Sequence, residues 1–137
     1  MTFVVDASLA LAWCFDDEAT DAADELMQRA MTETVVVPGI WPLEMANVLL
    51  LAERRSRIGP AKVKAFVDRL EALMIKVEPS PPETAFGDVL TLARANRLTV
   101  YDAAYLELAQ RLRVPLATRD RELVAAAGRV GVAILTG

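Results

Sequence analysis

The chain has 137 residues, of which 54% are hydrophobic and 25% charged, a composition typical of one globular domain with a sizeable core. It has no histidine and one cysteine, which largely excludes imidazole catalysis, thiolate metal sites and an internal disulfide. No apolar run approaches the roughly 20 residues that span a bilayer, and no basic segment opens a signal peptide, so we expect a cytoplasmic protein with no membrane partner.

The net charge of −4 is unevenly distributed. Residues 1–33 hold eight acids and one base, whereas residues 34–137 hold 14 bases and 11 acids. Phosphate contact requires a local basic surface rather than a basic protein, so this charge does not exclude a nucleic-acid partner. The arginines that could form such a surface, or equally ordinary solvated helix faces, are Arg54, Arg55, Arg57, Arg111, Arg113, Arg119 and Arg121.

The first half of the chain predicts alternating strands and helices. Short apolar, β-branched runs are typical of buried parallel strands, and the segments between them carry apolar residues at helical spacing. In chain order we expect a strand at Thr2–Val5, a helix capped by Ser8 and reaching about Phe15, an acidic helix over 17–31, a strand at Thr34–Val37, and a helix that begins at Pro42 and ends near Arg57.

The second half continues the alternation after a break at Gly59-Pro60. We expect a helix over 60–74, a strand at Ile75–Val77, a helix from Ser80 to about Asn96, a helix over 100–112, a strand at Val114–Thr118, a helix over 120–127 and a strand at Val132–Leu135. The pattern predicts an α/β fold. Residues 1–137 should form one domain, with a parallel sheet of four to five short strands and helices on both faces.

Four carboxylates are placed to meet at one edge of this sheet. Asp6 and Asp120 follow strands directly or nearly so, Glu44 lies one short loop beyond a strand, and Asp102 opens a helix. Ligands of open parallel sheets bind beyond the carboxyl ends of the strands. An acidic, all-oxygen site suits Mg²⁺ or Mn²⁺, which can activate water for phosphoryl displacement. Ser8 and Thr118, each two residues from an acid, could orient a carboxylate or a metal-bound water.

Each of these residues also has a purely structural explanation. Thr99 and Asp102 resemble a capping box, and Glu44 suits the positive end of a helix dipole. Asp120 could be an N-cap, as could the hydroxyl residues. Asp6 is harder to explain in this way, because it ends a strand expected to be buried, where an unpaired carboxylate is costly. Clustered carboxylates also repel one another unless a cation lies between them.

Taken together and in this order, the motifs resemble those of the PIN-domain nucleases, and most closely the VapC toxins of bacterial toxin–antitoxin pairs. The matching segments span essentially the whole chain. They are Val4-Val5-Asp6-Ala7-Ser8, Pro42-Leu43-Glu44 followed by Asn47, Tyr101-Asp102-Ala103-Ala104-Tyr105, and Thr118-Arg119-Asp120-Arg121-Glu122-Leu123.

The resemblance implies a catalytic site and a set of partners. Asp6, Glu44 and Asp102 would be the core metal ligands, directly or through water, and Asp120 would complete the acidic pocket and support a second metal position. Ser8 and Thr118 would support these acids. The cofactor would be Mg²⁺, or Mn²⁺, and the substrate RNA, such as tRNA or rRNA. The partners would be a cognate antitoxin protein and a second copy of the chain.

Other α/β classes fit less well. A haloacid-dehalogenase-type enzyme would carry a second Asp where Ser8 stands, a receiver domain would need a lysine near Thr118, and no glycine motif for dinucleotides follows the first strand. Two alternatives stay open: a PIN-domain RNA-processing nuclease that is not a toxin, and a degenerate PIN fold that binds RNA or protein without catalysis. The run Leu49-Leu50-Leu51 cannot all face one core, so part of it should either meet a partner or pack between two helices.

Overall fold

The computed structural model describes residues 1–136 and contains a five-stranded parallel sheet. The strands lie in the order β3-β2-β1-β4-β5, and every neighbouring pair runs in parallel. This arrangement confirms the predicted α/β class and strand number. The strands are β1 (Thr2–Val5), β2 (Thr34–Pro38), β3 (Ile75–Glu78), β4 (Leu116–Ala117) and β5 (Ile134–Leu135).

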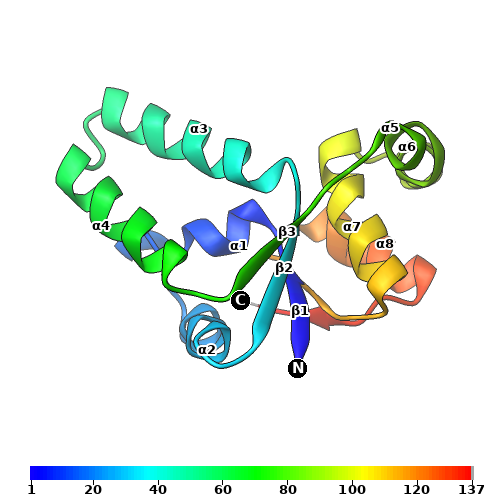
Figure 1. Cartoon of the computed structure of the whole chain (residues 1–137), viewed down its shortest axis with the longest axis horizontal. Helices are drawn as coiled ribbons and strands as arrows, with labels where there is room; N and C mark the ends of the chain where they lie inside the picture. The colour runs from blue at the N-terminus through cyan, green and yellow to red at the C-terminus, as the bar shows by residue number, and fades with distance from the viewer. Residues whose placement is uncertain (137) are drawn as a thin grey trace.

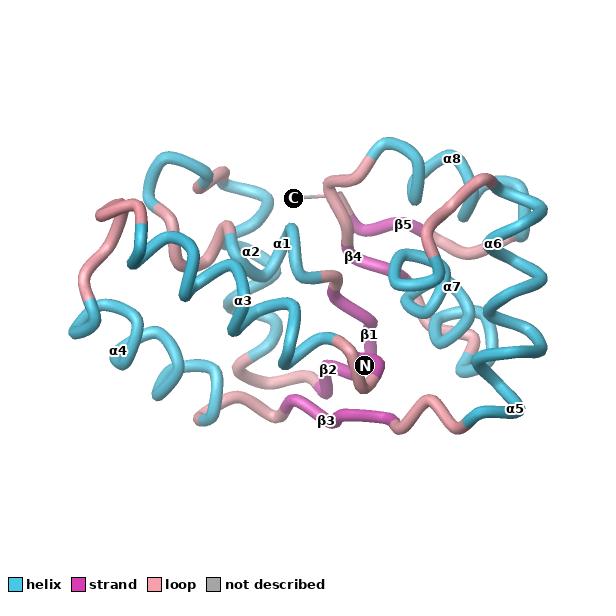
Figure 2. Tube along the Cα trace, turned by 90° about the horizontal axis from the view of Figure 1, so that it is seen from above, coloured by secondary structure: helices cyan, strands magenta, loops and turns pink. Residues whose placement is uncertain are grey.

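Helices cover both faces of the sheet, as Figure 1 and Figure 2 show. One face carries α1 (Ala7–Leu11), α2 (Asp21–Ala30), α3 (Trp41–Arg54) and α4 (Pro60–Glu71). The other carries α5 (Pro82–Thr84), α6 (Leu90–Asn96), α7 (Val100–Leu112) and α8 (Arg121–Val130). Neighbouring strands β1 and β4 therefore send their following segments to opposite faces. This is the topological switch point at which doubly wound sheets bind ligands.

The centre of the core is β1, because helices cover it on both sides. Phe3, Val4 and Val5 have no exposed surface, and Val4 pairs with Val36 of β2 and Leu116 of β4. A strand buried on both faces needs a continuous apolar run, which explains why the sequence identified it. Cys14 is buried in the core. Within residues 1–136 no helix has both the length and the apolar character needed to cross a bilayer.

The helix starts differ from the predictions at two places. Asp6, not Ser8, caps α1 by accepting a hydrogen bond from the Leu9 amide, and Ser8 lies inside that helix, which already ends at Leu11. The acidic helix expected over 17–31 is divided into a 3₁₀ turn, η1 (Asp16–Glu18), and α2, which is capped by Thr20. In both cases a side chain that accepts from a backbone amide two or three residues later fixed the boundary.

The second half of the chain is also more interrupted than predicted. The helix expected from Ser80 to Asn96 contains a π-helical turn, η2 (Ala85–Val89), that includes Gly87, a weak helix former. Strands β4 and β5 are two residues long each, shorter than the expected runs at Val114–Thr118 and Val132–Leu135. The last helix continues to Val130 and ends at Gly131, whose φ of 77° suits a residue without a side chain.

Candidate functional site

The four predicted acids line one pocket at the carboxyl edge of the sheet. Asp6 follows β1 and Asp120 caps α8 just after β4, so these two flank the switch point. Glu44 lies in the first turn of α3 and Asp102 in the first turn of α7. The pocket has a volume of about 240 Å³. Its lining residues are Asp6, Ala7, Ser8, Leu11, Glu44, Val48, Asp102, Tyr105 and Asp120.

Asp6 is the most deeply placed of the acids, with 4% of its surface exposed. Its carboxylate accepts hydrogen bonds from the Leu9 amide at 2.9 Å, from the Ser8 hydroxyl at 2.9 and 3.0 Å, and from the Thr118 hydroxyl. Burial raises the pKa of Asp6 above its usual range, and the charge of Asp120 adds to this, while the three hydrogen bonds oppose it. No lysine or arginine of the described chain pairs with it.

Thr118 joins two of the acids although it does not line the pocket. Its buried hydroxyl donates to Asp6 and accepts from the amide of Asp120 at 3.0 Å. Ser8, the other hydroxyl residue predicted to support the site, bonds only to Asp6. Both side chains thus hold the carboxylate of Asp6 in one orientation, which is the role that the sequence suggested.

Glu44 is half-buried and bonds to a tyrosine from the opposite side of the pocket. The Tyr105 hydroxyl donates to Glu44 Oε1 at 2.6 Å. Burial raises the pKa of Glu44, the hydrogen bond from Tyr105 lowers it, and the charges of Asp102 and Asp6 raise it further. The sequence analysis did not single out Tyr105 as a site residue. A signal was available, since Tyr105 lies three residues after Asp102 and so shares its helix face.

Asp102 and Asp120 also serve as local structural elements. Thr99 caps α7 by accepting from the Asp102 amide at 3.1 Å, one half of the capping box. Asp120 Oδ1 accepts from the amides of Glu122 at 2.8 Å and Leu123 at 3.1 Å. Burial raises the pKa of Asp102, and the charge of Asp120 raises it further. Asp120 is therefore the N-cap of α8, as that explanation predicted, and Thr99 supplies one half of the capping box before Asp102, yet neither contact accounts for the position of both acids in one pocket.

The donor set of the pocket fits a hard cation such as Mg²⁺. Its charged groups are all carboxylates. Beyond the effect of burial, the charges of Asp102 and Asp6 raise the pKa of Glu44, and the charge of Asp120 raises the pKa values of Asp6 and Asp102, a repulsion that a cation would relieve. The acids are nevertheless not packed around one point, because among residues 1–136 no three potential ligands form a ready cluster. Asp6, Glu44 and Asp120 are each held by hydrogen-bond donors of their own. Mg²⁺ keeps several of its waters and needs only one or two direct carboxylates.

Three of the arginines considered as phosphate contacts are engaged within the protein. The Arg57 guanidinium stacks 3.7 Å from the centre of the Phe15 ring and pairs with Asp17 and Glu18. Arg119 donates to the backbone carbonyl of Glu18 at 3.0 Å. These contacts attach η1 to the α3–α4 turn and to the segment before Asp120, so they are explained by the fold.

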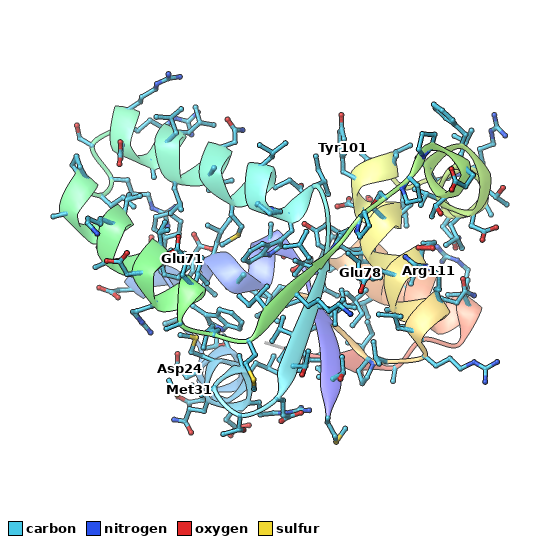
Figure 3. All side chains as sticks on the ribbon, in the orientation of Figure 1. Asp24, Met31, Glu71, Glu78, Tyr101 and Arg111 are labelled. Carbon is cyan, nitrogen blue, oxygen red and sulfur yellow. The ribbon has the colours of Figure 1, made fainter. Side chains whose placement is uncertain are left out.

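The third engaged arginine, Arg111, lies far from the acids. It pairs with the buried Glu107 at 2.7 Å, and Figure 3 shows it at the end of α7 opposite to Tyr101, the neighbour of Asp102. Of the arginines considered as phosphate contacts, those that stay exposed and form no ion pair with the described residues are Arg54, Arg55, Arg113 and Arg121. Of these, Arg121 directly follows Asp120 and is the nearest in sequence to the pocket.

The fold and this pocket define a class of protein: a doubly wound parallel sheet with four carboxylates at its switch point. A family model described as PIN domain matches residues 3–129. The chain belongs to the PIN-domain family, and its relatives are of the VapC type. It is similar to Ribonuclease VapC9 of Mycobacterium tuberculosis, with 31% identity over 120 residues, 88% of this chain and 87% of that one. It is also similar to Ribonuclease VapC3 of Pyrobaculum aerophilum, with 28% identity over 123 residues, 90% of this chain and 92% of that one.

Solved structures agree with this assignment. The crystal structure of PAE2754 from Pyrobaculum aerophilum has 26% identity and a TM-score of 0.71, and the match covers 98% of this chain and 84% of that one. The crystal structure of VapBC2 from Rickettsia felis, bound to a DNA fragment from their promoter, contains a chain with 12% identity and a TM-score of 0.66. That match covers 99% of this chain and 98% of the other, and it shows a shared fold.

Proposed function

We propose that this protein is a metal-dependent endoribonuclease and acts as the toxin of a toxin–antitoxin pair. The observation that carries the proposal is the pocket in which Asp6, Glu44, Asp102 and Asp120 meet at the switch point of the sheet. Two relatives that match about nine-tenths of the chain, VapC3 and VapC9, are named ribonucleases. A binding module for RNA would gain nothing from such a pocket, because four carboxylates repel phosphate.

The residues of the pocket would have different roles in such a reaction. Asp6 is buried and held by Ser8, Thr118 and the Leu9 amide, so it offers a carboxylate of fixed direction. Glu44 and Asp102 face the pocket from α3 and α7 and would hold the cation with Asp6, directly or through water. Bound there, Mg²⁺ or Mn²⁺ would lower the pKa of a water and offset the charge that develops on the phosphodiester.

The role of Asp120 is a supporting one in this proposal. One of its oxygens already accepts two amide hydrogens at the start of α8. Its charge acts on both Asp6 and Asp102, and Thr118 ties its backbone to Asp6. It would complete the negative potential that attracts the metal and would orient water rather than replace Asp6 or Asp102 as a ligand.

The substrate we propose is structured RNA in the cytoplasm, tRNA or rRNA. Proteins read RNA largely through its shape and through unpaired bases. Exposed Arg121 beside the pocket and exposed Arg54 and Arg55 at the end of α3 could contact its phosphates. The competing possibilities are an RNA-processing nuclease that is not toxic and a fold that has lost catalysis. Growth arrest on induced expression would exclude the first, and loss of cleavage in Asp6→Asn would exclude the second.

Removal and return of the metal tests the proposed activity directly. Protein treated with a chelator should not cut a pool of tRNA and rRNA, and millimolar Mg²⁺ or Mn²⁺ should restore discrete cleavage products. Ca²⁺, which prefers more ligands and longer distances, should restore little. The measurement is the appearance of new RNA ends on a sequencing gel. Cleavage that continues unchanged in excess chelator would contradict metal dependence.

An apolar groove beside the site is where we propose that partners bind. The groove lies between α3, α4 and the edge strand β3, and its volume is about 340 Å³. Leu49 is buried and lines the groove, whereas Leu50 is exposed, so the leucine run faces two environments, as expected; Val77, which also lines the groove, is exposed too. An amphipathic segment of an antitoxin could cover such a groove, and a second copy of the chain could cover the remaining apolar surface.

We expect a homodimer in the absence of antitoxin. Exposed apolar side chains on α3 and β3, among them Leu43, Leu50 and Val77, favour burial against a second copy. Sedimentation equilibrium over a wide range of protein concentrations should give twice the mass of the chain. A strict monomer at high concentration would contradict the homodimer.

A further inference from the structure

We propose that Tyr105 is a positioning residue that holds Glu44 for cation binding across the pocket. This inference rests on the proposed function, because it assigns to Tyr105 a role toward the same metal. Its basis is the 2.6 Å hydrogen bond from the Tyr105 hydroxyl to Glu44 Oε1, which joins residues 61 positions apart.

The bond connects two parts of the fold that pack on different neighbours. Glu44 belongs to α3, which packs against α1, whereas Tyr105 belongs to α7, which packs against β1, β2 and β4. Figure 2 shows α3 and α7 on opposite sides of the strands. The hydrogen bond therefore spans the carboxyl edge of the sheet. It sets the position of the α3 carboxylate relative to Asp102, which lies three residues before Tyr105 on the same helix.

The side chains of Tyr105 and Glu44 differ greatly in conformational freedom, and the more rigid one positions the other. The Tyr105 side chain is 1% exposed, and its ring is fixed by the surrounding core. Glu44 is half-buried and has a flexible side chain that would lose rotamer entropy on binding a metal. Because Tyr105 engages Oε1, the free oxygen Oε2 is left for a cation or its water, in one rotamer rather than several. The entropy of ordering Glu44 is thus lost during folding and not during metal binding.

A merely structural role would be the satisfaction of a buried hydroxyl. That role predicts an effect on stability alone, whereas positioning predicts an effect on metal affinity and turnover. Tyr105→Phe separates the two roles, because it removes the hydroxyl and keeps the ring in the core. Tyr101→Phe is a matched control, since Tyr101 lies on the same helix but is exposed and projects from its end (Figure 3).

The experiment is a calorimetric titration of RNA-free protein with Mn²⁺, accompanied by steady-state cleavage and thermal melting. We expect Tyr105→Phe to bind Mn²⁺ about 10- to 100-fold more weakly, the range seen when an outer-shell partner of a metal ligand is lost. At a fixed Mn²⁺ concentration near the dissociation constant of the wild type, kcat should fall while KM for RNA changes little. Tyr101→Phe should match the wild type in all three measurements.

A double-mutant cycle tests whether Tyr105 acts through Glu44. In a Glu44→Ala background, which lacks the carboxylate altogether, Tyr105→Phe should cause less than about a threefold further loss of Mn²⁺ affinity, because the partner it positions is gone. Equal losses in both backgrounds would overturn the inference. So would normal Mn²⁺ affinity in Tyr105→Phe, even with a lowered melting temperature. If the wild type itself binds no Mn²⁺, the proposed function falls and this inference with it.

Discussion

Asp6→Asn should lower RNA cleavage by at least about 100-fold while the protein stays folded, because even the outer-shell partners of a metal ligand are worth up to that much. The substitution removes the negative charge at the deepest point of the pocket and keeps the shape of the side chain. The amide oxygen can still accept from Leu9, and the amide nitrogen can donate to Thr118, so the cap of α1 is preserved. The loss should therefore be one of chemistry rather than of folding.

The matched control for this variant is Asp24→Asn. Asp24 is exposed in the first turn of α2, and Figure 3 shows it far from the start of α7. It should cleave RNA at the rate of the wild type. RNA binding by Asp6→Asn should be retained or become tighter, because a repulsive charge has been removed. Activity of Asp6→Asn within a few-fold of the wild type would refute a catalytic role for Asp6.

Asp102→Asn should stabilise the metal-free protein at neutral pH and abolish most of its stabilisation by Mg²⁺. In the folded state, burial and the charge of Asp120 raise the pKa of Asp102. A carboxyl whose pKa is raised on folding favours the fold when protonated, so its contribution is present below its unfolded pKa of about 4 and is lost as the pH rises through the folded pKa. The pKa values of Asp6 and Glu44 are also raised in the folded state, so their pH-dependent contributions to stability have the same sign as that of Asp102. The ionised pocket thus costs stability at pH 7 unless a cation is bound.

Thermal melts with and without Mg²⁺ measure this effect. Wild-type protein should gain about 2.7 kcal/mol at a Mg²⁺ concentration 100 times the dissociation constant, whereas Asp102→Asn should gain little. Without metal, the variant should melt a few degrees above the wild type at pH 7, and the difference should vanish near pH 4. Asp24→Asn controls for the loss of a first-turn acid, which by itself weakens a helix slightly. A variant that melts lower than the wild type without metal and still responds fully to Mg²⁺ would exclude the charged pocket as a cation site.

The sequence predicted the centre of this structure better than its periphery, for identifiable reasons. β1 is covered on both faces and must be apolar throughout, so Thr2–Val5 was recognisable as a strand. A carboxylate directly after such a strand is unusual, so Asp6 stood out as a site residue. By contrast, β4 has two paired residues, and the exact start of α1 depended on whether Asp6 or Ser8 caps the helix; Asp6 accepts from the Leu9 amide, and the Ser8 hydroxyl donates to Asp6. Local propensity does not distinguish such alternatives.

The candidate site, too, was predictable from the sequence in one part and not in another. The four acids could be predicted to meet, because strand ends and helix starts of a parallel sheet share one edge. The bond between Tyr105 and Glu44 could not, because it joins side chains 61 residues apart whose separation depends on how α3 and α7 pack. The engagement of Arg57 by Phe15, Asp17 and Glu18 was likewise invisible in the charge pattern. Side-chain partners distant in sequence are fixed only by the tertiary structure.

The most direct measurement is induced expression in a bacterial host, wild type beside Asp6→Asn, with mapping of new RNA 5′ ends across the transcriptome. If the protein is a metal-dependent ribonuclease toxin, the wild type should arrest growth and generate a few sharp new ends in tRNA or rRNA, and the variant should do neither. Soluble, folded wild-type protein that causes no arrest and no new ends, or equal ends from both proteins, would contradict the proposed toxin activity of this pocket.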